Sequence, residues 1–138
     1  MKTEKFLFQD KNGIFENVPD MHDCTAVASF ENGALTLTFD GLKQYSDPYD
    51  HKPWFGEYTK LTIICHGTER LCLELYFGKK EKLYSDTLAP LEGRELIMFN
   101  YAIDTFETMI LNFHVMFKKR LWGGKIEICF KEIECIWK

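Results

Sequence analysis

Hydrophobic and polar residues alternate along several stretches of the chain, most clearly within residues 30–39, 60–65 and 124–130. Neighbouring side chains of a β-strand point to opposite faces, so this alternation predicts strands with one buried and one exposed face. Long helical segments do not separate these stretches, which argues against parallel β-α-β units. The pattern predicts an all-β fold, a single antiparallel β-sandwich or flattened barrel of hairpins with about eight to ten strands and room for one short helix.

One hairpin is specified by two independent signals within residues 24–40. Asn32 and Gly33 tolerate the positive φ angles that a two-residue hairpin turn requires. A turn at this position places Phe30 opposite Leu35 and brings the apolar residues of both strands onto one face. Pattern and turn chemistry therefore predict the same register.

Three further hairpins are predicted from turn residues between apolar segments. Their turns are expected at Asn12-Gly13, Gly67-Thr68-Glu69 and Gly123-Gly124. The second turn sets Leu61 opposite Leu75, and the third sets Leu121 opposite Ile126. A separate strand is expected over residues 95–101.

Three segments depart from a simple strand pattern. Residues 105–117 fit either a strand or an amphipathic helix, and strand is favoured because Phe, Ile and Val are common in strands and the last hairpin needs a partner. Asp104 and Glu107 resemble a helix capping box, which keeps the helix open as an alternative. Residues 79–93 are expected to be irregular and to hold any short helix. Beyond Phe130 the apolar positions change parity, which predicts a β-bulge near Lys131-Glu132.

Length and composition bound the class of protein. The chain has 138 residues, 46% of them hydrophobic and 12 of them Phe, as expected for one β-rich domain spanning residues 1–138 with an aromatic core. No apolar run reaches the roughly 18 residues of a membrane span, and the first residues do not resemble an export signal. We therefore expect a cytoplasmic protein without a membrane partner.

The net charge of −4 argues against a nucleic-acid partner, because phosphate contacts need clustered Lys and Arg. The basic run Lys118-Lys119-Arg120 precedes the Gly-Gly pair and is interpreted as a solvated hairpin tip. Five cysteines lie in strand-like segments without a CxxC pair, and in a reducing compartment such residues are mostly small buried hydrophobes.

The sequence predicts neither a metal site nor a catalytic centre. His22, Asp23 and Cys24 form one candidate metal cluster and Asp47, Asp50 and His51 another, but neither has a known zinc spacing. A Gly-x-Ser-x-Gly elbow and a phosphate-binding glycine loop are both missing. We therefore expect a non-enzymatic protein without a cofactor.

The alternation stops between Gly41 and Glu57, where an aromatic and acidic segment with two prolines intervenes. A connection this long inside a small domain is usually functional or mobile. The candidate binding residues are Tyr45, Asp47, Tyr49, Asp50, His51 and Trp54, which suit a protein partner with a basic surface. The alternative is that Trp54 and Phe55 fold back and close the end of the core. Sequence leaves both interpretations open.

The segment from His22 to Phe39, with its strands around an Asn-Gly turn, and the last strand ending at Trp137 resemble small β-rich bacterial proteins of uncharacterised families. Some of those proteins are immunity proteins, which neutralise a toxin by binding it. The resemblance implies a cofactor-free binding protein, and it transfers no catalytic residue to this chain.

Two other functions stay open at this point. A small-molecule-binding protein or hydrolase would have a pocket between sheets, edged by His51, His66 and His114, and at least two of these imidazoles would have to converge. A structural subunit would associate through an exposed sheet edge and form a homodimer.

Overall fold

The computed structural model describes residues 1–103 and 108–138. Most of these residues lie in strands, which confirms the predicted all-β fold class. The strands are β1 (Lys2–Leu7), β2 (Thr25–Glu31), β3 (Ala34–Asp40), β4 (Lys60–His66), β5 (Arg70–Phe77), β6 (Lys80–Ser85), β7 (Glu95–Ile103), β8 (Met109–Phe117), β9 (Arg120–Cys129) and β10 (Glu132–Trp137). Helical residues in the described ranges are those of α1 (Lys11–Asn17) and of two 3₁₀ turns, η1 (Leu42–Gln44) and η2 (Ala89–Leu91). Within these ranges, none of the helices has the length and apolar character needed to cross a membrane.

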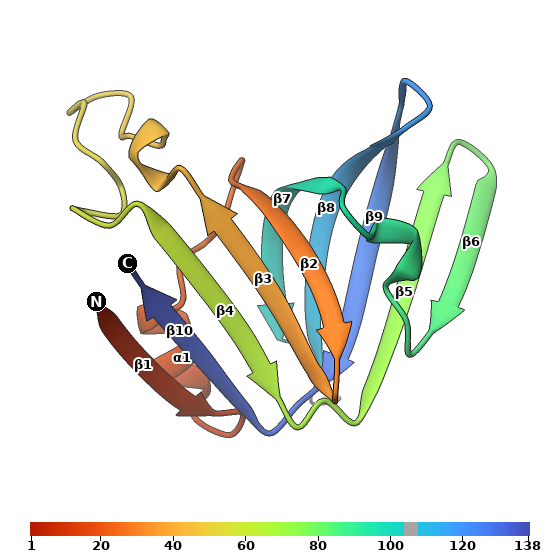
Figure 1. The fold of residues 1–138 in the computed structure, drawn as a ribbon, viewed down its shortest axis with the longest axis horizontal. Coiled ribbons are helices and arrows are strands. Elements are labelled where there is room, and N and C mark those ends of the chain that lie inside the picture. The colour runs from red at the N-terminus through yellow and green to blue at the C-terminus, as the bar shows by residue number, and fades with distance from the viewer. Residues whose placement is uncertain (104–107) are drawn as a thin grey trace.

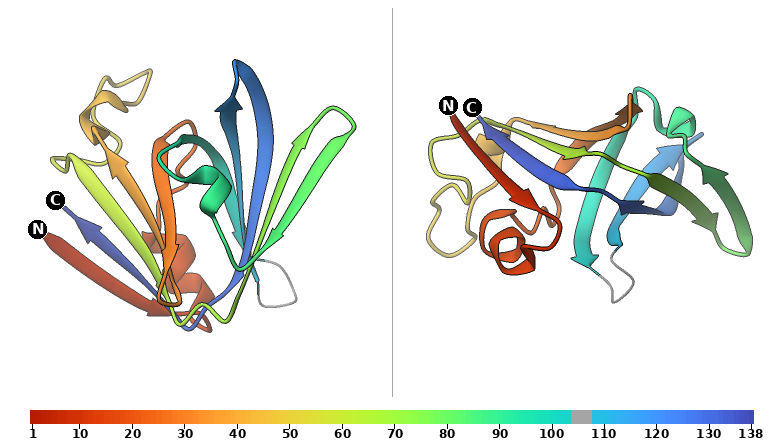
Figure 2. Two further views of the ribbon diagram at one scale, coloured as in Figure 1. Left: turned by 45° about the vertical axis from the view of Figure 1, so that its right-hand side comes forward. Right: turned by 90° about the horizontal axis from the view of Figure 1, so that it is seen from below.

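All ten described strands belong to one antiparallel sheet with the order β1-β10-β4-β3-β2-β7-β8-β9-β5-β6. The sheet bends where β2 pairs with β7, a junction of only three residue pairs, and does not close into a barrel. We call β1, β10, β4, β3 and β2 the first arm, and β7, β8, β9, β5 and β6 the second arm (Figures 1 and 2). The chain passes between the arms twice at one end of the molecule, from β4 to β5 and from β9 to β10 (Figure 1).

The core lies between the inner faces of the two arms. Alternate residues of nearly every strand are buried there, as the alternation predicts: Leu37 and Ile63 of the first arm, and Leu73 and Ile126 of the second, are each at most 1% exposed. Helix α1 contributes the fully buried Ile14 to the same core. Burial of these apolar side chains is the main stabilising contribution to the fold.

The hairpin of β2 and β3 has the predicted register. Phe30 pairs with Leu35, and both turn residues, Asn32 and Gly33, have positive φ angles of 52° and 71°. The predicted strand over residues 95–101 is confirmed as part of β7, and strand rather than helix is confirmed for residues 109–117 as β8. Residues 104–107, which hold the suggested capping box, lie outside the described residues.

The predicted pairing of residues 60–65 with residues 71–75 is wrong. Strand β4 pairs with β3 and β10, whereas β5 pairs with β6 and β9. Residues 67–69 cross from one arm to the other instead of reversing the chain, and the backbone N–H of Thr68 donates to the carbonyl of Gly33 (2.8 Å). Strands β4 and β5 each bury the predicted face, but β4 lies in the first arm and β5 in the second.

The predicted turn at Gly123-Gly124 is also wrong. The β8–β9 turn lies at Lys118 and Lys119, where both residues have positive φ angles, and Phe117 pairs with Arg120. Both glycines lie inside β9. A Cβ on Gly124 would come within 2.3 Å of the Phe113 ring. Steric demand from the core, rather than a chain reversal, requires a glycine there.

The first predicted turn, at Asn12-Gly13, is the start of α1. The carboxylate of Asp10 accepts a hydrogen bond from the backbone N–H of Gly13 (3.0 Å) and caps the helix. Strand β1 therefore does not form a hairpin with residues 14–15 and pairs with β10 instead.

Two smaller expectations also need correction. Residues 79–93 contain the strand β6 as well as the turn η2, so the segment is only partly irregular. The change of parity after Phe130 coincides with the passage of the chain from β9 in one arm to β10 in the other, which accounts for it without a bulge at Lys131.

Candidate functional site

The segment of residues 41–57 lies beyond β3 and β4, at the end of the first arm opposite the crossings between the arms (Figure 1). It begins with η1 and continues without regular structure apart from an isolated bridge between Ser46 and Pro53. We call this segment the aromatic loop. It is anchored at its base, where Leu42 is 1% exposed.

Two of its rings face the core. The hydroxyl of Tyr45 accepts a hydrogen bond from the backbone N–H of Thr25 (2.8 Å), which ties the loop to the start of β2. The ring of Phe55 packs edge-on against Tyr45 (6.5 Å between centroids) and lies 6.0 Å from the ring of Trp137 in β10. Tyr45 and Phe55 therefore close this end of the core.

Trp137 is the centre of that closure. Its ring lies 5.5 Å from Tyr58, and the Lys2 ammonium lies 5.3 Å from its centroid. Its indole N–H donates to a carboxylate oxygen of Glu4 (3.1 Å), so the polar edge of the buried ring is satisfied. The base of the aromatic loop is consequently held by packing as well as by hydrogen bonds.

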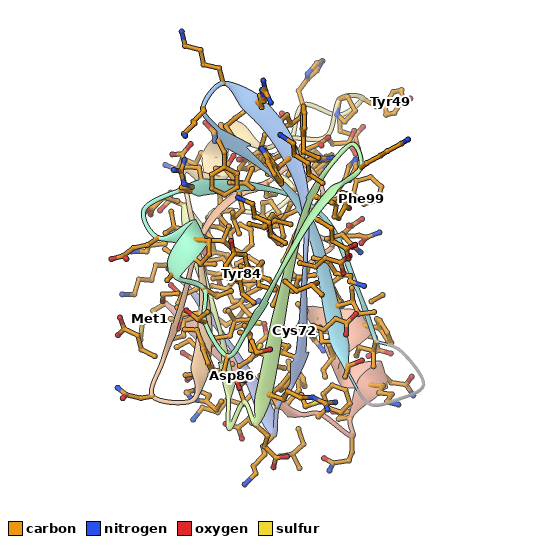
Figure 3. The ribbon with its side chains drawn as sticks, turned by 90° about the vertical axis from the view of Figure 1, so that its right-hand side faces the viewer. Met1, Tyr49, Cys72, Tyr84, Asp86 and Phe99 are labelled. Carbon is orange, nitrogen blue, oxygen red and sulfur yellow. The ribbon has the colours of Figure 1, made fainter. Side chains whose placement is uncertain are left out.

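Two other rings of the loop face outward. Tyr49 is 90% exposed and Trp54 is 49% exposed, and Figure 3 shows Tyr49 projecting from the periphery of the molecule. Rings exposed to this degree contribute little to the core. They give the loop an outward aromatic surface.

The tip of the loop is an ordered turn built on Asp47. Its carboxylate accepts hydrogen bonds from the backbone N–H groups of Tyr49 (2.7 Å) and Asp50 (3.1 Å), and its carbonyl accepts one from His51 (2.9 Å). His51 adopts a positive φ of 56° within this turn. Asp47 therefore fixes the backbone from which Tyr49 projects.

The structure thus separates the six predicted binding residues into two groups. Tyr49, Asp50, His51 and Trp54 are exposed, whereas Tyr45 and Asp47 hold the loop in place. The two interpretations of the loop, recognition surface and core plug, apply to different residues of the same segment.

The three histidines proposed to edge a pocket lie on separate elements. His51 is in the aromatic loop, and His66 is at the far end of β4, where its Nε2 lies 2.8 Å from a carboxylate oxygen of Glu134. His114 is exposed on β8, in the second arm, opposite Gly123. This arrangement gives no support to a histidine-lined pocket.

The cysteines behave mainly as core residues. Cys24, Cys65 and Cys135 are buried, and burial raises the pKa of the Cys135 thiol to about 12. Burial, with help from the Asp23 carboxylate, raises the pKa of Cys24 to about 11. Across residues 1–103 and 108–138, no three His, Cys, Asp or Glu side chains are grouped in a way that would hold a metal ion.

A second feature was not expected from the sequence. A pocket of about 530 Å³ opens on the inner face of the second arm, near the β8–β9 turn and η2. Its cationic lining residues are Lys80, Lys82, Arg94, Lys118 and Arg120. These residues are spread over 41 positions of sequence and are brought together by the strand order. The basic run Lys118-Lys119-Arg120, interpreted from the sequence as a solvated hairpin tip, supplies two of them.

No protein-family model, curated protein or solved structure matches this chain. The resemblance to immunity proteins therefore stays a prediction.

Proposed function

We propose that this chain is a non-enzymatic protein-binding domain that recognises its partner through the outward rings of the aromatic loop. A toxin-neutralising immunity protein is one form of this function. The observation that carries the proposal is the 90% exposure of Tyr49 on a turn whose backbone is fixed by Asp47. An exposed ring on an ordered turn supports binding, since little conformational entropy is lost when the partner covers it.

The surroundings of Tyr49 support a partner with basic character. Asp50 and Glu57 are exposed in the same loop, and the whole chain carries a net charge of −4. Opposite charge on the partner would accelerate association and discriminate against acidic proteins. The aromatic rings would supply most of the binding energy, and the carboxylates mainly specificity.

Association of two copies through sheet edges receives less support. Both edge strands carry exposed lysines, Lys2 and Lys5 on β1 and Lys80 and Lys82 on β6. Charged residues on edge strands oppose pairing with another strand.

Affinity capture from the native cell, followed by quantitative mass spectrometry, tests the proposal. We expect a specific protein to be retained by the wild-type chain and lost with the double substitution Tyr49→Ala/Trp54→Ala. The matched control is Leu83→Ala, which removes a 65% exposed side chain from β6 at the opposite edge of the sheet. Equal retention by the wild-type chain and the loop variant would refute the role of the loop.

A further inference from the structure

The inner face of the second arm changes from apolar to cationic near the strand ends at β8–β9 and β5–β6. Leu75 is buried and lies opposite Lys82, and the next inward pair is Phe77 and Lys80. On the neighbouring strands, Arg120 occupies the equivalent inward position. The same face of the sheet therefore carries buried leucines in the core and charged side chains near the strand ends.

The positive charge of this pocket is not balanced by acids. Five cationic side chains line it, and the lining contains no carboxylate. None of the five forms an ion pair within 4.0 Å with any carboxylate of the described ranges, whereas Lys5 and Lys125 do. Like charges that converge without counter-ions repel each other, and an anion bound between them would remove that repulsion.

Aromatic rings hold three of these cations in place. The pairs are Arg94 over Phe117 (4.4 Å), Arg120 over Phe77 (5.5 Å) and Lys82 over Trp122 (5.6 Å). The Arg94 guanidinium also donates a hydrogen bond to the carbonyl of Met116 (3.0 Å). Its remaining N–H groups stay available to a ligand, and the rings restrict the cations before any ligand arrives.

Protection of the sheet edge explains only part of this arrangement. Lys80 and Lys82 belong to the edge strand β6, where lysine discourages pairing with another chain. Arg94 follows η2, and Lys118 and Arg120 flank the β8–β9 turn, so none of these three protects an edge. They nevertheless converge on the same space as the two lysines.

We propose that this pocket binds a nucleoside phosphate. The cations would contact the phosphates through charge-assisted hydrogen bonds, and the nucleobase would pack on the apolar floor formed by Tyr84, Phe117 and Trp122. Tyr84 lies on the inner side of β6 toward η2, as Figure 3 shows. A volume of about 530 Å³ lies within the range of small-molecule sites.

Calorimetric titration of the full chain with ATP, adenosine and inorganic triphosphate tests the ligand class. ATP is expected to bind, more weakly at raised ionic strength, because exposed charges are screened by salt. Adenosine and triphosphate are each expected to bind at least about tenfold more weakly than ATP, since each lacks one half of the recognised chemistry.

Substitution of two pocket cations tests the location. Lys82→Ala/Arg120→Ala is expected to weaken ATP binding at least about tenfold, because two charge-assisted contacts are lost. Both side chains are exposed, so the thermal midpoint should move by roughly 2 °C or less. The control Lys11→Ala/Lys43→Ala removes two exposed cations on α1 and η1 and should leave ATP binding unchanged.

A second readout covers the case in which the double variant unfolds. Quenching of tryptophan emission by ATP should decrease markedly with Trp122→Phe, since Trp122 lines the pocket. Absence of ATP binding at millimolar concentration, or binding unaffected by both pocket variants, would overturn the proposal. So would triphosphate binding as tight as that of ATP, or much tighter binding of a single-stranded oligonucleotide. Tyr49→Ala/Trp54→Ala should not alter ATP binding, so this proposal and that of the aromatic loop fail independently.

Discussion

The hydroxyl of Tyr45 accepts a hydrogen bond from the backbone N–H of Thr25 at 2.8 Å, which joins the aromatic loop to the first residue of β2. Tyr45→Phe removes this acceptor and leaves a partly buried N–H without its partner. We expect the free energy of unfolding to fall by about 1 kcal/mol. The change is measured by urea denaturation.

The control for that substitution is Tyr58→Phe. Tyr58 packs against Trp137, and its hydroxyl makes no hydrogen bond with the described part of the chain. The control should change the free energy of unfolding by less than about 0.5 kcal/mol. Equal losses in the two variants would show that the Tyr45 hydroxyl does not anchor the loop.

Truncation of two rings of the loop should reduce stability by different amounts. Phe55→Ala removes a ring packed on Trp137 and is expected to cost about 1–3 kcal/mol of stability. Tyr49→Ala removes a ring that is 90% exposed and should cost less than about 0.5 kcal/mol. Thermal and urea unfolding of the two variants check this order, and the reverse order would contradict the division of the loop into inward and outward rings.

The two adjacent glycines of β9 should differ in their tolerance of alanine. A Cβ at Gly124 would lie 2.3 Å from the ring of Phe113, which is 2% exposed and cannot move aside. A Cβ at Gly123 would meet Tyr76, whose ring is 44% exposed and can rotate into solvent. Gly124→Ala is expected to cost about 2–3 kcal/mol and Gly123→Ala less than about 1 kcal/mol, as urea denaturation would show.

A double substitution separates overpacking from a general loss of strand propensity. Phe113→Leu replaces the obstructing ring with a smaller side chain. Gly124→Ala should therefore lower the free energy of unfolding less in that background than in the wild-type chain. Strictly additive costs would exclude direct steric conflict between the two positions.

Stability should decrease at alkaline pH because of the buried thiols. Burial raises the pKa of Cys135 to about 12, whereas a thiol in the unfolded chain titrates near 8.5. The stabilising contribution is therefore complete below the unfolded pKa, and it is lost as the pH rises toward the folded value. At about pH 10 we expect a loss of about 2 kcal/mol from this thiol, measured by urea denaturation at several pH values.

Cys135→Ala is the corresponding variant. It removes one titrating group, so the free energy of unfolding should fall less steeply between about pH 8 and pH 10. Cys24 and Cys65 have raised pKa values as well, so part of the dependence should persist. An unchanged slope would show that Cys135 does not titrate differently in the folded and unfolded chains.

The alternation of side chains predicts which face of each strand is buried, but it does not predict which strands are neighbours. The inner faces of β4 and β5 are those expected, with Ile63 and Leu73 buried, yet the strands lie in different arms. Periodicity reports burial, whereas pairing depends on distant segments. The Gly123-Gly124 error has the same origin, because only the packed core shows that Phe113 excludes a side chain there.

The position of the aromatic loop is predictable because the alternation stops and rings accumulate there. Which rings face inward is not, since that depends on Trp137 and Thr25, which are distant in sequence. The cationic pocket escaped prediction for a related reason. Lys82 and Arg120 are brought together by strands that are not consecutive in the chain.

Titration of the purified partner into the wild-type chain and into Tyr49→Ala/Trp54→Ala tests the central claim most directly. The loss of two outward rings is expected to weaken binding by at least about 100-fold, since interface aromatics often contribute 2 kcal/mol or more each. The thermal midpoint of the variant should stay within roughly 2 °C of the wild-type value. An unchanged dissociation constant, with the variant folded, would contradict the account.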